Sequence, residues 1–205
     1  MIELKNICKA YGEKTIIKDF NLRVEKGEFI SLTGKSGSGK TTILNIIGMI
    51  TQPDSGDVII NHVNNPSSKE IQKLRRNNFA YIFQNFVLME NETVKTNLYI
   101  SKKFNPDFDE KLVMEVLKKV GFDESYLKKK IYQLSGGEQQ RIAIARAMLK
   151  KCDIILADEP TGNLDEENKF IIIDLLLQLK SMEKTIICVT HDRDIAIAAD
   201  RIVNI

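Results

Sequence analysis

The 205-residue sequence lacks tryptophan and contains only two histidines, four prolines and three cysteines. The cysteines, Cys8, Cys152 and Cys188, stand alone, without the paired spacing that zinc sites and redox motifs need. They predict buried free thiols in a reducing compartment. Repeats and low-complexity segments are also missing, which excludes the fibrous and disordered classes.

A long hydrophobic run is missing as well. The first five residues contain no apolar signal segment, and the most apolar late stretch, residues 170–179, is interrupted by Asp174. A transmembrane helix needs about 20 apolar residues, so we expect a cytosolic chain that reaches a membrane only through a separate subunit. The formal net charge is only +2, which gives no electrostatic reason to expect nucleic acid as a partner.

Hydrophobic residues make up 43% of the chain and charged residues 28%, which is enough to bury the core of one domain. The spacing of apolar residues predicts an α/β fold. Strands are expected at residues 2–7, 15–24, 29–32, 58–60, 79–83, 153–157, 185–189 and 201–205. Helices are expected at residues 40–50 and 69–78, from Asn105-Pro106 to a Gly121 cap, after Leu134-Ser135-Gly136-Gly137, and at residues 165–180 and 192–199. Residues 61–68 are predicted to form a polar turn.

The most specific motif is a glycine-rich loop between a predicted strand and a predicted helix. The segment Gly34-Lys35-Ser36-Gly37-Ser38-Gly39-Lys40-Thr41 satisfies the pattern GxxxxGK[ST]. Its glycines let backbone N–H groups point at phosphate oxygens, and the helix N-terminus adds favourable partial charge. We expect Lys40 to reach the β- and γ-phosphates of a nucleotide, Thr41 to ligate Mg²⁺, and Thr42 to belong to the same nucleotide-binding segment. A flexible loop without a ligand is the alternative.

Two adjacent carboxylates follow the predicted strand at residues 153–157. In an α/β sheet the carboxyl ends of the strands hold the chemistry. Asp158 would orient Mg²⁺ through its water shell, and Glu159 would accept a proton from an attacking water or polarise it. Alone, such a pair is usually a solvated turn. Together with the glycine loop it predicts a site for nucleoside triphosphate hydrolysis.

The segment Leu134-Ser135-Gly136-Gly137-Glu138-Gln139-Gln140-Arg141 distinguishes this chain from other proteins with such a loop. By itself it is a helix N-terminus capped by Ser135. It also resembles the signature sequence of ATP-binding-cassette (ABC) ATPases. Residues 158–165, Asp-Glu-Pro-Thr-Gly-Asn-Leu-Asp, resemble their Walker B and D-loop segments in the macrolide-exporter, lipoprotein-releasing and bacteriocin-export branch. The resemblance extends over the whole chain.

Roles for single residues follow from this resemblance. It implies that Tyr11 stacks on adenine, that Gln84 contacts Mg²⁺ and the attacking water, and that His191 contacts the γ-phosphate. From the residues alone, Tyr11 would be a half-buried strand tyrosine and His191 a structural histidine. His62 matches no family position and is predicted to lie on the surface.

The resemblance implies a P-loop NTPase fold, with a RecA-like core, an antiparallel β edge and a helical subdomain. The core lobe would comprise about residues 1–84 and 151–205, and the helical lobe about residues 85–150. Two departures from the family pattern are present. Thr96 stands where Glu commonly completes a capping box begun at Thr93, so a weaker helix cap is expected. The chain stops at Ile205, so the regulatory domain of many relatives is not expected.

The resemblance also implies the partners. Two ATPase subunits would sandwich two ATP molecules, each between the glycine loop of one chain and Ser135, Gly136 and Gly137 of the other. An integral membrane permease would bind at the cytoplasmic face of the membrane. The apolar run Phe86-Val87-Leu88-Met89, just after Gln84, would either dock this permease or pack the helical lobe against the core.

The leading functional hypothesis is therefore the ATP-hydrolysing subunit of a bacterial exporter of antimicrobial peptides, bacteriocins or lipoproteins. A non-exporting switch is the alternative, which would act through a membrane partner on cell-wall or division machinery. A soluble ATPase of iron–sulfur assembly is a weaker third hypothesis.

Overall fold

The computed structural model describes residues 2–162 and 164–205; Asn163, which belongs to the expected D-loop, lies outside the described residues. A parallel sheet of five strands runs through the middle of this part of the chain, in the order β6-β7-β8-β3-β9. Its strands are β3 (Phe29–Thr33), β6 (Phe79–Phe83), β7 (Ile154–Asp158), β8 (Thr185–Val189) and β9 (Arg201–Asn204). The three inner strands are almost completely buried, because helices or a second sheet cover both faces.

The second sheet is antiparallel and has the strand order β2-β1-β4-β5. It consists of β1 (Ile2–Tyr11), β2 (Lys14–Val24), β4 (Ser55–Ile60) and β5 (Val63–Asn64). The prediction of a plain polar turn at residues 61–68 is wrong, because β5 pairs with β4 there. Asn61 and His62 both have positive φ, which is the geometry of a tight hairpin turn, and His62 is exposed as expected.

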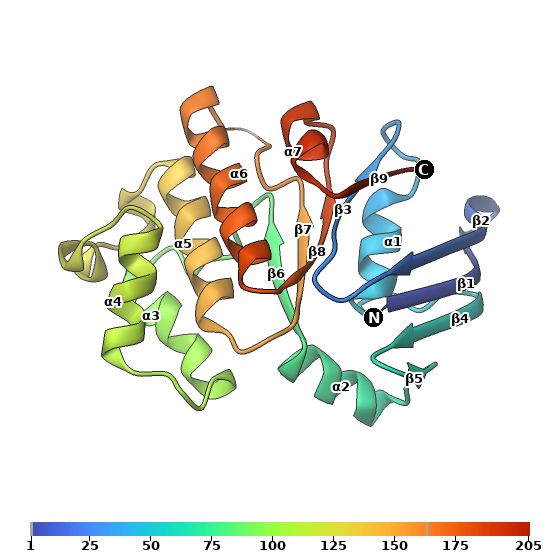
Figure 1. Cartoon of the computed structure of the whole chain (residues 1–205), viewed down its shortest axis with the longest axis horizontal. Helices are drawn as coiled ribbons and strands as arrows, with labels where there is room; N and C mark the ends of the chain where they lie inside the picture. Colours follow the sequence, from blue (N-terminus) through green and yellow to red (C-terminus); the bar gives the residue numbers. More distant parts are fainter. Residues whose placement is uncertain (1, 163) are drawn as a thin grey trace.

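Helix α1 (Lys40–Ile47) lies between the two sheets (Figure 1). Its buried side chains share one hydrophobic cluster with β1 and with alternate residues of the parallel sheet, such as Ile30, Leu32, Leu156 and Ile187. The expected extension of this helix to residue 50 is wrong. Met49 has a φ of +58°, and the N–H groups of residues 50 and 51 both turn back to the carbonyl of Asn45.

The opposite face of the parallel sheet is covered by α5 (Gly136–Leu149) and α6 (Glu166–Ser181) (Figure 1). The remaining alternate strand residues, such as Phe29, Ile155 and Cys188, belong to a second cluster that continues into these helices. The same cluster includes residues from α3 (Val94–Tyr99) and α4 (Glu110–Lys119). The hydrophobic core of the helical segment is therefore continuous with that of the sheet.

Further short elements complete the described part of the chain. They are α2 (Ser68–Asn77), η1 (Ile100–Phe104), η2 (Glu124–Lys128), η3 (Ile131–Gln133) and α7 (Arg193–Ala198). Asp165 and Asp192, expected as first helical residues, are instead the N-caps of α6 and α7. Thr93 caps α3 by accepting a hydrogen bond from the backbone N of Thr96, so a cap forms without the missing Glu.

The predicted start of a helix at Asn105-Pro106 is wrong, because α4 begins at Glu110. Asn105 accepts a hydrogen bond from the backbone N of Asp107 and donates one to the carbonyl of Leu149, which holds a turn at this point. Asp109 is the N-cap, and its carboxylate accepts a hydrogen bond from the backbone N of Leu112. The predicted stop is correct, because Gly121 follows the helix with a φ of +80°.

The thiols differ from the sequence prediction in one case. Cys152 and Cys188 are buried and free, but Cys8 is only partly buried, beside a register shift between β1 and β4. Burial raises the pKa of the Cys152 thiol to about 11, which makes this thiol unreactive at neutral pH.

In residues 2–162 and 164–205, no helix has the length and apolar character needed to cross a membrane.

Candidate active site

The glycine loop (residues 34–41) connects the carboxyl end of β3 to the N-terminus of α1. Gly34 and Gly39 have φ values of +146° and +101°, which favour glycine. Close neighbours exclude a side chain at Gly34 and crowd one at Gly39. A Cβ on Gly34 would lie 2.3 Å from the carbonyl oxygen of Ile205, and one on Gly39 would lie 3.0 Å from Cγ2 of Ile16. The loop therefore keeps its backbone open toward the space in front of it.

Lys40 is held in place by this loop. Its Nζ donates hydrogen bonds to the carbonyl oxygens of Gly34 at 3.0 Å and Lys35 at 2.9 Å. These carbonyls carry no net charge, so the positive charge of Lys40 stays available to an anion. The Oγ of Ser38 is buried and has no hydrogen-bond partner in the described part of the chain. Such an orphaned polar atom fits a loop built around a ligand with phosphate oxygens.

A hollow of about 430 Å³ opens beside the glycine loop. The glycine loop and α1 contribute Ser36, Gly37, Gly39, Lys40, Thr41 and Thr42 to its lining. The β1–β2 hairpin contributes Tyr11, Lys14 and Ile16, Glu159 comes from the residue just after β7, and Val189 from the end of β8. Tyr11 is 54% exposed, and an exposed ring at this position can stack on a base.

Sequence reasoning missed Lys14, Ile16 and Val189 as lining residues. The sequence did contain a signal for Lys14 and Ile16, because side chains alternate between the two faces of a strand such as β2. Lys14 and Ile16 are two residues apart in one strand, so their side chains point to the same face of the sheet as each other.

Asp158, the last residue of β7, lies next to the start of α1. The Oγ1 of Thr41 donates a hydrogen bond to Oδ1 of Asp158 over 3.2 Å. Burial raises the pKa of Asp158, and the negative charge of Glu159 adds to this effect, while the hydrogen bond from Thr41 opposes it. A hydroxyl and a carboxylate are oxygen ligands of the kind that Mg²⁺ prefers.

Among residues 2–162 and 164–205, no group of three or more His, Cys, Asp or Glu side chains is arranged to hold a metal ion. Mg²⁺ in phosphoryl-transfer sites is commonly bound by one or two protein ligands, with substrate phosphates and water as the others. The pair Thr41 and Asp158 therefore fits Mg²⁺ bound together with a nucleotide, and does not fit a metal held by the protein alone.

Glu159 and His191 contact each other at the ends of neighbouring strands. Nδ1 of His191 lies 2.8 Å from Oε2 of Glu159, and the backbone N of His191 donates to the same oxygen over 3.3 Å. The Glu159 side chain is 18% exposed and that of His191 is 74% exposed. Glu159 has a φ of +47°, a left-handed conformation that is strained for this residue type. Backbone strain of this kind is concentrated at functional sites, where the surrounding structure holds it.

Gln84 directly follows β6, and it lies near Asp158 but outside the hollow beside the glycine loop. Gln84, Asp158 and Gly136 line a second hollow of about 610 Å³ that does not include the glycine loop. A Cβ on Gly162 would lie 2.8 Å from Nε2 of Gln84, so this side chain also lies against the loop that follows Glu159. The structure thus places Gln84 in a hollow that Asp158 also lines, whereas Glu159 lines the hollow beside the glycine loop.

The Ser135 cap (residues 135–138) closes the N-terminus of α5 with its own side chains. Ser135 Oγ accepts a hydrogen bond from the backbone N of Glu138, and the Glu138 carboxylate accepts from the backbone N of Ser135 at 2.7 Å. The hydroxyl of Tyr126 also donates to Glu138. Burial opposes ionisation of Glu138, but the hydrogen bonds from Ser135 and Tyr126 hold its pKa below the usual value.

None of Ser135, Gly136 and Gly137 lines the hollow beside the glycine loop. Ser135 and Gly136 are exposed, whereas Gly137 is buried against α6. The structure of one chain therefore does not bring the Ser135 cap to the glycine loop. A site that contains both needs a second copy of the chain.

The Gln84 loop (residues 84–93) is held by a residue that sequence reasoning missed. The guanidinium of Arg146, on α5, donates to the carbonyl of Val87 at 2.7 Å and to that of Phe86 at 3.2 Å. Both of these loop residues have positive φ. Val87 is 52% and Met89 is 40% exposed, but Leu88 packs against the core. The packing expectation for the apolar run is therefore confirmed for Leu88, while Val87 and Met89 stay exposed.

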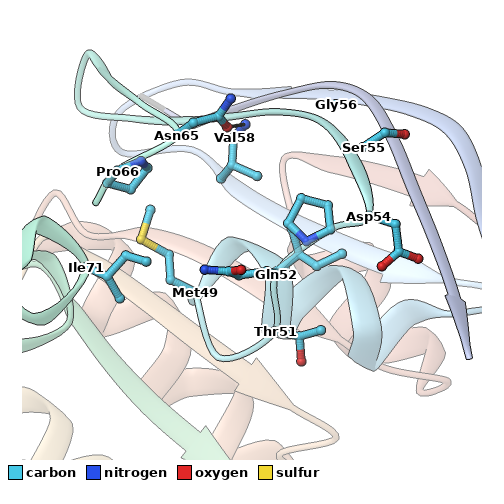
Figure 2. Close-up of a pocket in the computed structure, with 12 residues that line it drawn as sticks. Met49, Thr51, Gln52, Asp54, Ser55, Gly56, Val58, Asn65, Pro66 and Ile71 are labelled. Carbon is cyan, nitrogen blue, oxygen red and sulfur yellow. Dashed lines mark hydrogen bonds between the residues drawn. The ribbon is translucent and has the colours of Figure 1, made fainter. Parts of the chain in front are cut away.

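A third hollow, of about 290 Å³, lies apart from these residues (Figure 2). It opens between the end of α1, β4 and the start of α2, and Met49, Val58 and Ile71 form its apolar part. The carboxylate of Asp54 at its edge pairs with Lys9. No residue of the glycine loop lines it, so we assign it no part in the candidate active site.

Comparisons with known proteins agree with this geometry. A family model described as ABC transporter matches residues 17–162. An uncharacterized ABC transporter ATP-binding protein of Methanocaldococcus jannaschii, MJ0796, is 41% identical over 216 residues, which cover 99% of this chain and 92% of that protein. A dimeric structure of the same cassette in a post-hydrolysis state, bound to ADP and Pi, superimposes with a TM-score of 0.89 at 38% identity. That match covers 100% of this chain and 94% of the solved chain.

A second group of relatives is longer. The macrolide export ATP-binding/permease protein MacB of Pasteurella multocida is 39% identical over 212 residues, which cover 99% of this chain but 32% of that protein. MacB of Campylobacter jejuni is 40% identical over 216 residues and is covered to 33%. This chain therefore spans about a third of the length of these curated relatives.

Proposed function

The chain belongs to the ABC transporter family, and on that premise we propose that it is the ATP-hydrolysing subunit of a bacterial exporter that works through separate permease subunits. One observation carries the catalytic part of this proposal. The carboxylate of Glu159 accepts a hydrogen bond from the backbone N of His191 and lies 2.8 Å from its Nδ1, and Glu159 lines the same hollow as Lys40 and Thr41 of the glycine loop.

Each part of the site has a task in this proposal. The glycine loop and Lys40 hold the phosphates of ATP, and Thr41 and Asp158 hold Mg²⁺. When bound, Mg²⁺ neutralises negative charge on the phosphates. Glu159 polarises the attacking water or takes its proton, and Gln84 orients that water. His191, which is mostly exposed, is free to contact the γ-phosphate while its backbone N–H keeps Glu159 in place.

The Ser135 cap supplies the other half of the site in a dimer. In an α-helix the first N–H groups lack partners within the helix. The cap satisfies the backbone N of Glu138, while those of Gly136 and Gly137 remain outside the hydrogen bonding of α5. The positive end of the helix dipole would then face the γ-phosphate bound to the glycine loop of the second copy. The dimeric cassette structures of the relative support this arrangement.

The permease would dock on the Gln84 loop, through the exposed side chains of Val87 and Met89. Two exposed apolar side chains in one short loop are unusual unless a partner covers them. Arg146 fixes the backbone of this loop, so a force on the loop would reach Gln84 and the site beside it. The docked chain would lie on the cytoplasmic face of the membrane.

We assign the direction of transport as export. The macrolide-export relatives support this direction, and the D-loop form at residues 158–165 resembles the same branch. The proposed cargo is an antimicrobial peptide, a bacteriocin or a lipoprotein-type substrate, chosen by the permease.

Substitution of the exposed loop residues tests the coupling. Val87→Asp and Met89→Asp should keep basal ATP hydrolysis. The unmodified chain should co-purify with a multispanning membrane protein, and both variants should lose this protein. Both variants should also lose the stimulation of ATP hydrolysis that this protein causes in proteoliposomes. Ile197→Asp is the matched control, because Ile197 is 76% exposed on α7. Leu88→Asp should unfold the chain, since Leu88 packs against the core. Unchanged co-purification of the Val87 and Met89 variants would contradict the docking proposal.

A further inference from the structure

Lys169 connects three segments that meet behind the catalytic pair. It lies in the first turn of α6, and its side chain is 19% exposed. Its Nζ lies 3.2 Å from Oδ1 of Asp192 and 2.5 Å from Oδ2 of Asp194. Asp192 directly follows His191 in the chain, so the ammonium group binds the segment that carries His191.

The same carboxylate also reaches the segment that carries Glu159. Oδ2 of Asp192 accepts a hydrogen bond from Oγ1 of Thr161 over 3.3 Å, and Thr161 is buried two residues after Glu159. Oδ1 accepts a hydrogen bond from the backbone N of Asp194 and caps α7. Oδ2 of Asp192 therefore joins the two catalytic segments, and Lys169 supplies a cation at Oδ1 of the same carboxylate.

Helix stability does not explain a lysine at this position. The N-terminus of a helix favours negative side chains, because its dipole is positive there. Here the first turn of α6 contains Lys169 after two glutamates. The hydrogen bond that Lys169 donates to Asp194 raises its pKa most, and the one to Asp192 adds to this effect, while desolvation opposes it. The raised pKa keeps the side chain charged. Its location is thus explained by what it binds outside its own helix.

The negative charges around the site favour such a cation. Asp158, Glu159, Asp192 and Asp194 gather at the carboxyl ends of β7 and β8, and like charges in a partly buried site repel each other. Without Lys169, the carboxylates of Asp192 and Asp194 would lie together with no ammonium group between them. Separation of these groups would move the His191 segment away from Glu159.

We propose that Lys169 is a positioning residue, which acts through Asp192 and Thr161 to hold His191 against Glu159. The inference rests on the proposed function, because it assigns a task within ATP hydrolysis. Lys169 itself contacts neither the glycine loop nor the hollow beside it. Its removal should therefore lower kcat and leave nucleotide binding in place.

The test compares Lys169→Met, which keeps the length of the side chain without its charge, with Lys169→Arg and Lys180→Met. Lys180 is the matched control, because it forms an ion pair with Asp200 near the other end of the same helix. We expect Lys169→Met to lower kcat about tenfold or more, with KM changed by about twofold or less, since small misplacements of catalytic groups have large kinetic effects. Lys169→Arg should recover most of kcat, and Lys180→Met should leave it unchanged.

Histidine NMR provides a readout that a purely stabilising role would not move. The chain has two histidines, and His62 lies in the exposed β4–β5 turn, so it serves as an internal reference for His191. In Lys169→Met the ring signal of His191 should shift while that of His62 stays, and Lys180→Met should move neither. Thr161→Val, which removes the hydroxyl that binds Asp192, should shift the His191 signal in a folded chain even where Lys169→Met does not fold.

The outcomes separate the inference from the proposed function. If the unmodified chain shows no Mg²⁺-dependent ATP hydrolysis, the proposed function is wrong. If the unmodified chain hydrolyses ATP and Lys169→Met does so at the same rate, or if kcat falls while the His191 signal stays in place in both variants, the positioning role is wrong.

Discussion

The N-termini of α1 and α5 are both rich in glycine, yet they are stabilised in opposite ways. Gly39, the N-cap of α1, has no side chain to cap the helix, and Lys40 binds carbonyl oxygens of its own loop. The start of α5 has a complete capping box, in which Ser135 and Glu138 bind each other. The first region thus gains hydrogen bonds when an anion arrives, whereas the second already has its final shape.

This difference suggests an order of events. The glycine loop has a lysine and the hydroxyl of Ser38, which is unpaired among the described residues, so it can bind a nucleotide within one chain. The Ser135 cap offers the first N–H groups of α5 and a helix dipole but no cation, and a site of this kind binds an anion weakly by itself. It can contribute once the nucleotide is already held by the glycine loop of a second copy.

The largest expected effect is on the chemistry beside the glycine loop. Glu159→Gln should lower kcat by about 10²- to 10⁴-fold, the usual contribution of a general base, because the amide keeps the shape and cannot take a proton. ATP binding should remain, since the substitution leaves the glycine loop intact. Steady-state hydrolysis and binding of a fluorescent ATP analogue check both parts. A variant that hydrolyses ATP at the parent rate would remove Glu159 from the catalytic role.

The next largest effect concerns the positive charge of Lys40, which the N-terminus of α1 has and that of α5 lacks. Lys40→Met should weaken ATP binding by roughly 10- to 150-fold, as expected for loss of a hydrogen bond to a charged group worth about 1.5–3 kcal/mol. Thermal stability should change little, because Lys40 binds only carbonyls in its own loop. Calorimetric titration with ATP measures the affinity, and an unchanged Kd would contradict a phosphate role for Lys40.

A smaller effect concerns stability at the start of α5. A Cβ on Gly137 would lie 2.3 Å from Cγ of Asn168, whose amide is held by Asp165, so Gly137→Ala should cost about 1–3 kcal/mol of the free energy of unfolding. The neighbouring Gly136 has 3.7 Å to its nearest atom, so Gly136→Ala should be neutral or slightly stabilising. Denaturant unfolding of the pair measures the difference. Equal stabilities would show that the cap tolerates a side chain at either position.

The smallest effect is expected at the base. Stacking on Tyr11 is worth on the order of 1 kcal/mol, so Tyr11→Ala should raise the Kd for ATP about tenfold or less. Stacking contacts the face of the base and not its hydrogen-bonding edge, so the preference for ATP over GTP should be modest. An unchanged Kd would make Tyr11 a structural residue at the end of β1.

The family and the P-loop fold could be predicted from the sequence and are confirmed, because their signals lie in short continuous segments such as residues 34–41 and 134–141. The start of α4 could not, since Asn105 forms a turn by binding Leu149, which is distant in sequence. For the same reason Arg146 and Lys169 escaped notice, because their partners lie on other elements. The lobe boundaries and the roles of the site residues stay predictions.

The most direct test of the composite site is sedimentation of Glu159→Gln with Mg²⁺ and either ATP or ADP. The account predicts a dimer with ATP and a monomer with ADP, because the γ-phosphate is the group that both N-termini share. Gly136→Asp in the same background should bind ATP and stay monomeric, since its carboxylate would face the γ-phosphate from the exposed cap. A Glu159→Gln chain that stays monomeric with ATP shown to be bound would contradict the composite site.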